Sequence, residues 1–337
     1  MPIIQSRRRF LTTLASAGAA GLTRPPHGFA AEGPLETTAV RLAKQTNANV
    51  CGAPEYLAGE LLRAEGFTDI RYVDMPPGGA VMQAIGHGDV DFGTSFAPTF
   101  VAALDAGEPI AVLSGVMVGC VEVFANASVR GVADLKGRSA GVLFLGATAH
   151  MLLTVMAAQV GLDPRGDIRW VTAEPAQLRE RFENGDVDAY LGQPPESQDL
   201  CARHIGHVIL NTATDRPWSQ YFCCLLGGNR DYVRRYPVAT KRVLRAVLKA
   251  ADLCATNPTG ATQRLVDGGF TDRYGSTLQT FSENGFDKWR EYDAEDTLRF
   301  FALRLHETGF IKSSPQKLIA DGTDWRFLDE LKRELKA

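Results

Sequence analysis

Gly88-Asp89-Val90-Asp91 and Gly185-Asp186-Val187-Asp188 are two copies of one tetrad, and each lies between a short amphipathic segment and an apolar stretch. Val81, Met82 and Ile85 share one helical face before the first copy. The tetrad glycine tolerates the left-handed conformation that ends many helices, and the valine after it begins a buried strand. A helix that returns directly into a strand is half of a βαβ unit, so the repeat predicts two α/β lobes.

The segments around the tetrads follow the same order in both halves of the chain. Expected strands are residues 37–42, 70–73, 92–95, 110–115, 120–126, 168–171, 208–210 and 221–226. Expected helices are residues 53–64, 98–106, 147–160, one that starts at 174–175, and a tail at 232–256, 262–266, 293–307 and 325–336. We therefore expect a leader at 1–30, the first part of lobe 1 at 31–120, lobe 2 at 121–222, and a return to lobe 1 with C-terminal helices at 223–337.

The N-terminus, Ser6-Arg7-Arg8-Arg9-Phe10-Leu11 followed by an uncharged run to Leu22, resembles a twin-arginine export signal. The run is too short to span a bilayer. Small residues precede Ala31, so cleavage is expected after Ala30, which would place the mature protein in the periplasm. The alternative is a basic N-terminal segment on a cytosolic protein.

Charge and cysteine spacing narrow the classes of partner. The whole chain has a formal charge of −3, and removal of a leader with four arginines and no acids leaves −7. A mildly acidic chain argues against binding to nucleic acid, which needs clustered Lys and Arg.

The six cysteines lack Cys-x-x-Cys spacing, so neither a metal site nor a cofactor is expected. Cys120, Cys223 and Cys224 lie in apolar runs, where thiols more often act as small hydrophobes than as disulfides. Cys223 and Cys224, as neighbours in a strand, should point to opposite faces.

Asp134-Leu135-Lys136-Gly137, a following strand, and Gly146-Ala147-Thr148 at a helix start resemble the nitrate/sulfonate/taurine group of periplasmic solute-binding proteins. The two tetrads strengthen the resemblance, which covers most of the chain from about Val40 to Leu226. The family usually has Trp-Glu-Pro after the second tetrad, whereas this chain has Gly192-Gln193-Pro194, so no ligand identity carries over. The resemblance implies an α/β fold, a two-lobed type II periplasmic binding protein with two crossing strands and a helical C-terminal extension.

In such a fold the ligand lies between the lobes, at the ends of strands and the starts of the following helices. Glu55 occupies one such helix start. The candidate ligand-binding residues that the resemblance implies are Asn47, Asn49, Tyr56, Gly79, Thr94, Ser95 and Phe96 on lobe 1, Ala147, Thr148, His150, Gln193 and Glu196 on lobe 2, and Trp218 near the return crossing.

Several of these side chains have two interpretations. The helix start at Ala147 and Thr148 offers free N–H groups to an anionic oxygen, although Thr148 could simply cap that helix. His150 could contact a ligand or serve a local cap. Thr94 and Ser95 could bond a ligand or their own backbone, and Phe96 and Trp218 could stack on a planar ligand or be buried. The tetrad carboxylates Asp89, Asp91, Asp186 and Asp188 are interpreted as structural, because each pair lies at a turn in a different lobe.

The functional hypothesis is a monomeric receptor, with no catalytic residue, for a small organic solute such as a sulfonate, an aromatic acid or a pyrimidine. Its partners would be that solute and an inner-membrane ABC permease. The alternative is an enzyme related to the fungal pyrimidine synthases of thiamine biosynthesis. Phe222-Cys223-Cys224 resembles part of their cysteine-rich motif but lacks its further cysteines.

Overall fold

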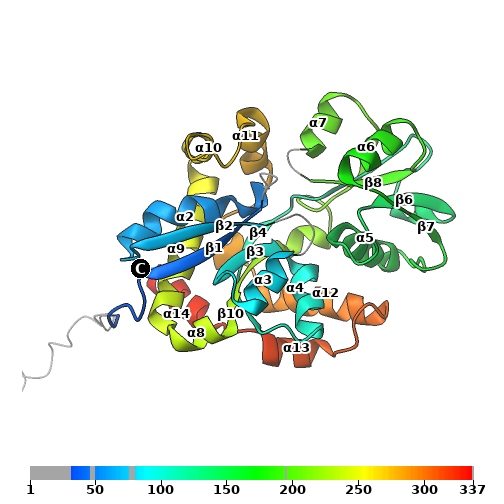
Figure 1. Ribbon diagram of the computed structural model, residues 1–337. Coiled ribbons are helices and arrows are strands. Elements are labelled where there is room, and N and C mark those ends of the chain that lie inside the picture. Colours follow the sequence, from blue (N-terminus) through cyan, green and yellow to red (C-terminus); the bar gives the residue numbers. More distant parts are fainter. Residues whose placement is uncertain (1–31, 46–49, 76–79, 194–195, 336–337) are drawn as a thin grey trace, which may run out of the picture. The chain divides into compact units, whose positions relative to one another are not determined.

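The computed structural model describes residues 32–45, 50–75, 80–193 and 196–335. The predicted leader and its cleavage site therefore lie outside the described residues. Every helix and strand below lies within the unit Leu35–Ala337 (Figure 1). Among the described residues, no helix combines the length and apolar character needed to span a bilayer.

The first sheet has the strand order β2-β1-β3-β10-β4. Its strands are β1 (Ala39–Gln45), β2 (Asp69–Met75), β3 (Phe92–Phe96), β4 (Ile110–Val118) and β10 (Phe222–Asn229). β1 pairs in parallel with β2 and β3, whereas β10 runs antiparallel to β3 and β4. The helices that connect these strands are α2 (Ala53–Ala64), α3 (Ala80–His87) and α4 (Ala97–Asp105).

The second sheet repeats this arrangement with the order β7-β6-β8-β5-β9. Its strands are β5 (Glu122–Ala125), β6 (Arg138–Val142), β7 (Ile168–Thr172), β8 (Ala189–Gly192) and β9 (His207–Asn211), and its helices are α5 (Thr148–Gln159), α6 (Pro175–Glu183) and α7 (Glu196–Ala202). β6 is parallel to β7 and β8, and β5 is antiparallel to β8. The predicted two-lobed α/β fold is confirmed.

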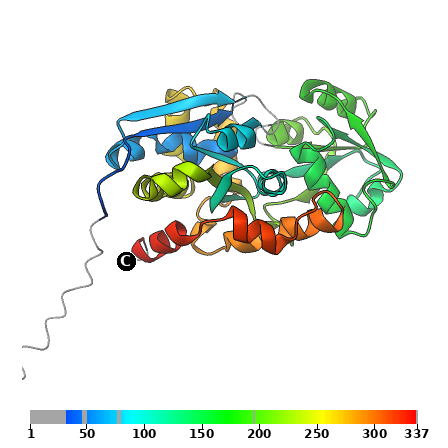
Figure 2. The ribbon, with the colours of Figure 1, turned by 60° about the horizontal axis from the view of Figure 1, so that its bottom comes forward.

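The tail after β10 is helical, as predicted (Figures 1 and 2). Its helices are α8 (Arg230–Arg235), α9 (Pro237–Thr256), α10 (Pro258–Asp267), α11 (Tyr274–Glu283), α12 (Ala294–Glu307), α13 (Pro315–Gly322) and α14 (Arg326–Glu334). The single helix predicted over 232–256 is wrong: the helix breaks at Tyr236, because Pro237 has no N–H and disfavours helical geometry in the residue before it. α11 and α13 were not predicted.

The last aspartate of each tetrad, directly before β3 or β8, binds the backbone of the parallel strand beside it. Asp91 Oδ2 accepts the backbone N–H of Arg41 in β1 at 2.7 Å, and Asp188 Oδ2 accepts the backbone N–H of Ser139 in β6 at 2.8 Å. Gly88 and Gly185 have φ of 77° and 80°, the left-handed conformation predicted for these helix ends. The two contacts are equivalent in the two lobes, and they support the structural interpretation of these carboxylates.

Two segments cross between the sheets, one from β4 to β5 and one from β9 to β10. Thr212 joins them: its Oγ1 donates to the Val121 carbonyl at 2.9 Å and accepts the Val121 N–H at 3.0 Å. The strand predicted at 120–126 begins only at Glu122, because Gly119 and Cys120 have φ of 93° and 84°, which extended strands do not allow.

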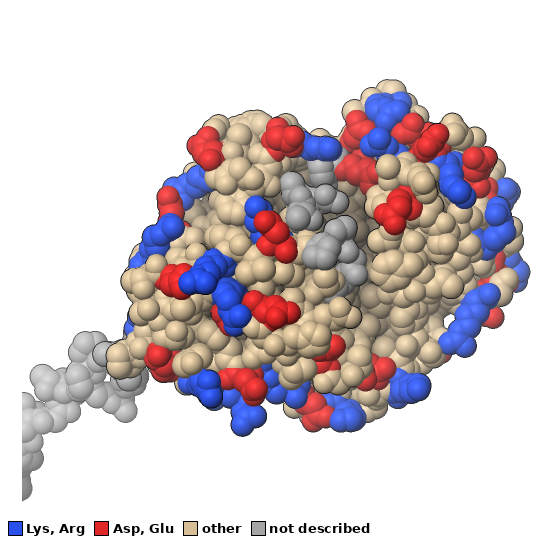
Figure 3. All heavy atoms as spheres, viewed as in Figure 1, with Lys and Arg blue, Asp and Glu red and all other residues tan. Residues whose placement is uncertain are grey.

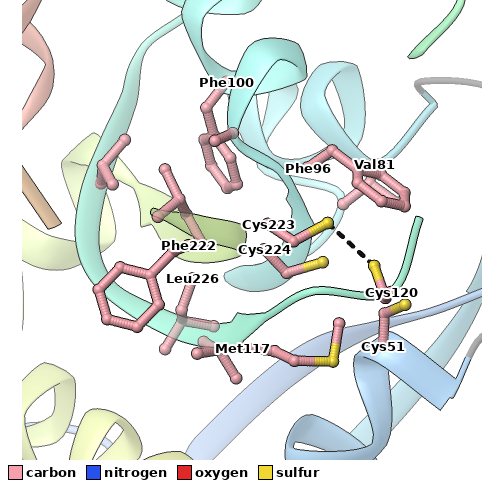
Figure 4. Packing of buried hydrophobic residues seen from close by; sticks show 14 of the residues in the cluster. Cys51, Val81, Phe96, Phe100, Met117, Cys120, Phe222, Cys223, Cys224 and Leu226 are labelled. Atoms are coloured by element: carbon pink, nitrogen blue, oxygen red, sulfur yellow. Dashed lines mark hydrogen bonds between the residues drawn. The ribbon is translucent and has the colours of Figure 1, made fainter. Parts of the chain in front are cut away.

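The cysteines around these crossings are buried thiols (Figure 4). The prediction that Cys223 and Cys224 point to opposite faces is wrong. Phe222 pairs with Val118 and Cys224 with Met117, so two residues of β10 advance against one of β4. Such a bulge redirects side chains, and both thiols turn toward Cys120, as Figure 4 shows.

We expect Asp188→Ala to destabilise the protein by about 2–3 kcal/mol, because it leaves the partly buried N–H of Ser139 without its acceptor. Asp186→Ala, at an exposed carboxylate of the same turn, is the control and should cost less than about 0.5 kcal/mol. Chemical denaturation measures both. Equal losses would remove the proposed role of Asp188.

The contribution of the Asp188 carboxylate to the stability of the fold should depend on pH. Desolvation would raise the pKa of Asp188, but hydrogen bonds from Ser139 and Asn126 and the charge of Arg138 outweigh it, so the pKa is below its ordinary value. A lowered pKa contributes stability above the unfolded-state pKa, and that contribution disappears as pH falls through the folded-state value. The difference between wild type and Asp188→Ala should therefore shrink below about pH 4.

Thr212→Val should cost about 1–3 kcal/mol, since it leaves the buried N–H of Val121 unpaired. Thr212→Ser keeps the hydroxyl and serves as the matched control, with a smaller loss. Unfolding free energies of the three proteins give the comparison. If the valine and serine variants were equally stable, the hydroxyl bridge would contribute nothing to the crossing.

Candidate functional site

The start of α2 and the end of β3 bring together two buried polar side chains, Glu55 and Thr94. Glu55 Oε2 accepts the Thr94 backbone N–H at 2.9 Å. Within the described part of the chain, Glu55 Oε1 and Thr94 Oγ1 have no hydrogen-bonding partner, although both atoms are inaccessible to solvent. Buried polar atoms are nearly always paired. Two unpaired polar atoms on side chains that lie next to each other therefore indicate a place where another molecule could form hydrogen bonds.

Burial also changes the protonation of Glu55. Desolvation raises the pKa of its carboxyl from an ordinary 4.5 to about 8, and the hydrogen bond from Thr94 offsets only part of that rise. At neutral pH the group is a carboxylic acid, which offers one O–H donor together with acceptor oxygens. The Thr94 hydroxyl can donate or accept in the same way. Glu55 and Thr94 therefore form a polar, uncharged pair.

The other predicted lobe 1 residues pack within the protein. Tyr56 stacks on Phe270, with ring centroids 5.1 Å apart, and its hydroxyl accepts the Gln45 N–H at 3.1 Å. Ser95 is buried, and Phe96 is buried in the hydrophobic core directly before α4 (Figure 4). Asn47, Asn49 and Gly79 lie outside the described residues.

The helix starts of the two lobes meet at a pair of threonines. Thr99, in the first turn of α4, and Thr148, the first residue of α5, share a hydrogen bond between their hydroxyls at 3.1 Å. The sequence suggested that Thr148 could cap its helix, but it does not. The N-cap is Ala147, whose side chain has no hydrogen-bonding atom. In the part of the chain that the structure describes, no side chain caps the first N–H groups of α5.

His150 has a local partner. Its Nδ1 accepts the Gly146 N–H at 2.9 Å, and its ring packs edge-on against Trp170 at 4.6 Å. Burial lowers the pKa of the imidazole, which favours the neutral form that this hydrogen bond requires. His150 also borders a cavity of about 500 Å³ between the α5 start and the loop after α12, together with Arg165 and Phe310. The capping interpretation of His150 therefore has direct geometric support.

The remaining predicted residues lie around β8, α7 and the return crossing. The Gln193 carbonyl accepts the N–H of Glu196 at 2.7 Å and so starts α7. Burial raises the pKa of Glu196, whose Oε2 accepts the Tyr190 hydroxyl at 2.6 Å. Trp218 is buried edge-on against Phe300 of α12, with centroids 5.6 Å apart.

The arrangement thus brings some of the predicted residues together and separates others. Thr94 contacts Glu55, and Thr148 contacts Thr99. Trp218 and His150 instead pack separately, against Phe300 and beside Gly146. Glu55 was marked only by its position at a helix start, and its burial could not be read from the sequence. On the face shown in Figure 3, Lys and Arg are interspersed with Asp and Glu rather than gathered in a patch of one sign.

Solved structures of binding proteins share this fold. The alkanesulfonate-binding protein SsuA from Xanthomonas axonopodis pv. citri, bound to MOPS, matches with a TM-score of 0.69 and 20% identity, covering 87% of this chain and 100% of that one. The periplasmic nitrate-binding protein NrtA from Synechocystis PCC 6803 matches with a TM-score of 0.75 and 16% identity, covering 90% of each chain. At this identity the likeness establishes the fold alone.

Curated relatives match at low identity. The nitrate import ATP-binding protein NrtC from Synechocystis sp. is 23% identical over 221 residues, which is 61% of this chain and 32% of that protein. The nitrate/nitrite binding protein NrtA from Nostoc sp. is 24% identical over 129 residues, 38% of this chain and 29% of that protein. The chain thus spans about a third of the length of these relatives.

A model of the NMT1-like family matches residues 36–266, which include both tetrads and the Asp134–Gly137 motif. The match covers well over half of the chain. The resemblance drawn from those motifs is confirmed, and the protein belongs to the NMT1-like family.

Proposed function

We propose that this protein is the substrate-binding component of an ABC importer, and that it holds a small organic solute between its two lobes in the periplasm. The observation that carries the proposal is the architecture of two similar α/β lobes joined by two paired crossings, with the helix starts of α4 and α5 in contact at Thr99 and Thr148. The family and the transport functions of NrtA, NrtC and SsuA support it.

Closure of such a protein needs contacts from both lobes. A solute shifts the open–closed equilibrium only by as much as it prefers the closed form. In this chain the first lobe offers Glu55 and Thr94, and the second offers the uncapped N–H groups at the start of α5. The paired crossings at Thr212 and Val121 are the hinge about which the lobes would move.

The chemistry of these groups favours a solute with both an anionic and an uncharged polar end. A helix N-terminus suits a sulfonate or carboxylate oxygen, whereas protonated Glu55 and the Thr94 hydroxyl suit a neutral amide, hydroxyl or ring nitrogen. The candidate ligand-binding residues of the cleft remain those expected from the sequence, with Glu55 and Thr99 added. An organic sulfonate, an aromatic acid or a pyrimidine meets this description.

The proposed route begins with export by the twin-arginine pathway and cleavage near Ala30. The mature monomer would then deliver its solute to an inner-membrane permease, with no nucleic acid and no catalytic step involved. The alternative, an enzyme related to thiamine-pyrimidine synthases, predicts turnover. Purified protein incubated with iron and a pyridoxal cofactor should yield no pyrimidine product, and product formation would replace the receptor proposal.

A thermal-shift screen of sulfonates, aromatic acids and pyrimidines tests the proposal directly. A solute at a hundred times its dissociation constant should stabilise the protein by about 2.7 kcal/mol. Solution scattering with that solute should show a smaller radius of gyration, because the lobes close. If inorganic nitrate alone raised the melting temperature, the organic-solute proposal would be wrong, and unchanged dimensions with every bound solute would contradict closure.

The protonated state of Glu55 has its own test. The folded protein holds this proton up to about pH 8, whereas the unfolded chain releases it near pH 4.5. Stability should therefore fall as pH rises between these values, and Glu55→Gln should remove a pH dependence on the order of 3 kcal/mol. Urea denaturation from pH 5 to 8 measures it, with Glu60→Gln, an exposed residue of the same helix, as control. Parallel curves for wild type and Glu55→Gln would show that Glu55 is ionised in the fold.

A further inference from the structure

Four cysteines from three separate parts of the sequence gather at one point beside the crossings (Figure 4). The Sγ atoms of Cys51, Cys120 and Cys224 all lie within 4.8 Å of one another. The Cys223 Sγ lies 2.9 Å from the Cys120 Sγ. All four residues are less than a tenth exposed. Thus two-thirds of the cysteines of the chain occupy one buried cluster, which we call the thiol cluster.

Three separate structural features bring these thiols together. Cys51 lies in η1 (Val50–Gly52), the short turn between β1 and α2. Cys120 lies in the first crossing with φ of 84°, a conformation that residues with side chains rarely adopt. The bulge in β10 turns Cys223 and Cys224 to the same side. A cysteine that serves only as a small hydrophobic residue does not have to lie beside other cysteines.

The donor set is soft and uniform. The cluster contains sulfur ligands only, and Met117, the strand partner of Cys224, adds a thioether beside it in Figure 4. Sulfur ligands select Cu⁺ and Zn²⁺ over the harder divalent ions. In tetrahedral thiolate sites the Zn–S bond is about 2.3 Å, which places the sulfur atoms about 3.8 Å apart. The sulfur atoms of Cys51, Cys120 and Cys224, all within 4.8 Å of one another, approach this spacing. The Cys223 Sγ, at 2.9 Å from that of Cys120, is nearer than two ligands of one ion would be, so Cys223 would move away from Cys120 to become the fourth ligand.

We propose that Cys51, Cys120, Cys223 and Cys224 form a binding site for one thiophilic d10 metal ion, Zn²⁺ or Cu⁺. Each coordinating thiol releases its proton to solvent as the metal–sulfur bond forms. The site has no Cys-x-x-Cys spacing by which the sequence could predict it, because its ligands come from η1, the first crossing and the start of β10.

The position of the thiol cluster gives the ion a mechanical role. Cys120 belongs to the first crossing, Cys223 and Cys224 follow the second, and Cys51 lies four residues before Glu55. A bound ion would tie both crossings to the rim of the first lobe. The ion would then hold the hinge segments in one arrangement and raise the stability of the folded protein by mass action.

Metal titration of the full chain tests the site without reference to any solute. Reduced, chelator-treated protein is titrated with Zn²⁺ against a chromophoric zinc indicator, and anaerobically with Cu⁺ against a chromophoric Cu⁺ chelator. We expect one ion per chain, a higher melting temperature, and sulfur-to-metal charge-transfer absorption when Co²⁺ replaces Zn²⁺. The ion with the greater affinity identifies which of the two the site prefers. Failure of both ions to bind the reduced protein would overturn the proposal.

Matched variants locate the ion. Cys120→Ser and Cys224→Ser should each weaken binding at least a hundredfold, whereas Cys254→Ser, at a buried thiol of α9 outside the cluster, should leave binding intact. Circular dichroism and melting of each metal-free variant confirm that it folds. Should Cys120→Ser not fold, Cys224→Ser decides alone. Unchanged affinity in both cluster variants, or equal losses in Cys254→Ser, would place the ion elsewhere and contradict the proposal.

Discussion

The hydrogen bond that a tetrad carboxylate accepts from the backbone N–H of a neighbouring strand is the contact on which each lobe depends. Asp91 holds β1 through Arg41, and Asp188 holds β6 through Ser139. An aspartate at the start of a strand can bond the N–H of its neighbour only if the two strands are parallel and in one register. The carboxylate thus fixes β3 beside β1 and β8 beside β6 at the start of each strand.

The pairing of the two crossings, the proposed hinge, is the second constraint, and three features of the molecule meet there. Thr212 and Val121 pair the crossings, while Gly119 and Cys120 turn the first crossing out of the β4 direction. The thiol cluster occupies the same region. A hinge between lobes must keep its backbone groups paired while it bends, and side-chain bridges such as the Thr212 hydroxyl achieve this where a regular ladder is interrupted.

The candidate site combines an uncharged polar pair, Glu55 and Thr94, with a helix terminus. Glu55 is a neutral acid only because water is excluded from it, and among the described residues the hydroxyl of its partner Thr94 has no hydrogen-bonding partner. A polar group in such a setting gives more specificity than affinity, since a solute that fails to pair with it leaves a buried donor unsatisfied. The uncapped start of α5 complements it with partial positive charge. The proposed solute follows from this pairing of a neutral rim with an electropositive one.

The sequence alone determined the architecture, because short local motifs specify it. The repeated tetrads and the helix-ending glycines predicted two α/β lobes, and the resemblance at residues 134–137 predicted the family. Proline at 237 broke a predicted helix through the same local chemistry. Long-range contacts decided the rest. The protonation of Glu55, the meeting of Thr99 with Thr148 and the convergence of four cysteines depend on burial and on a strand bulge. Those are properties of packed neighbours distant in the chain, so no spacing of residues along the sequence encodes them.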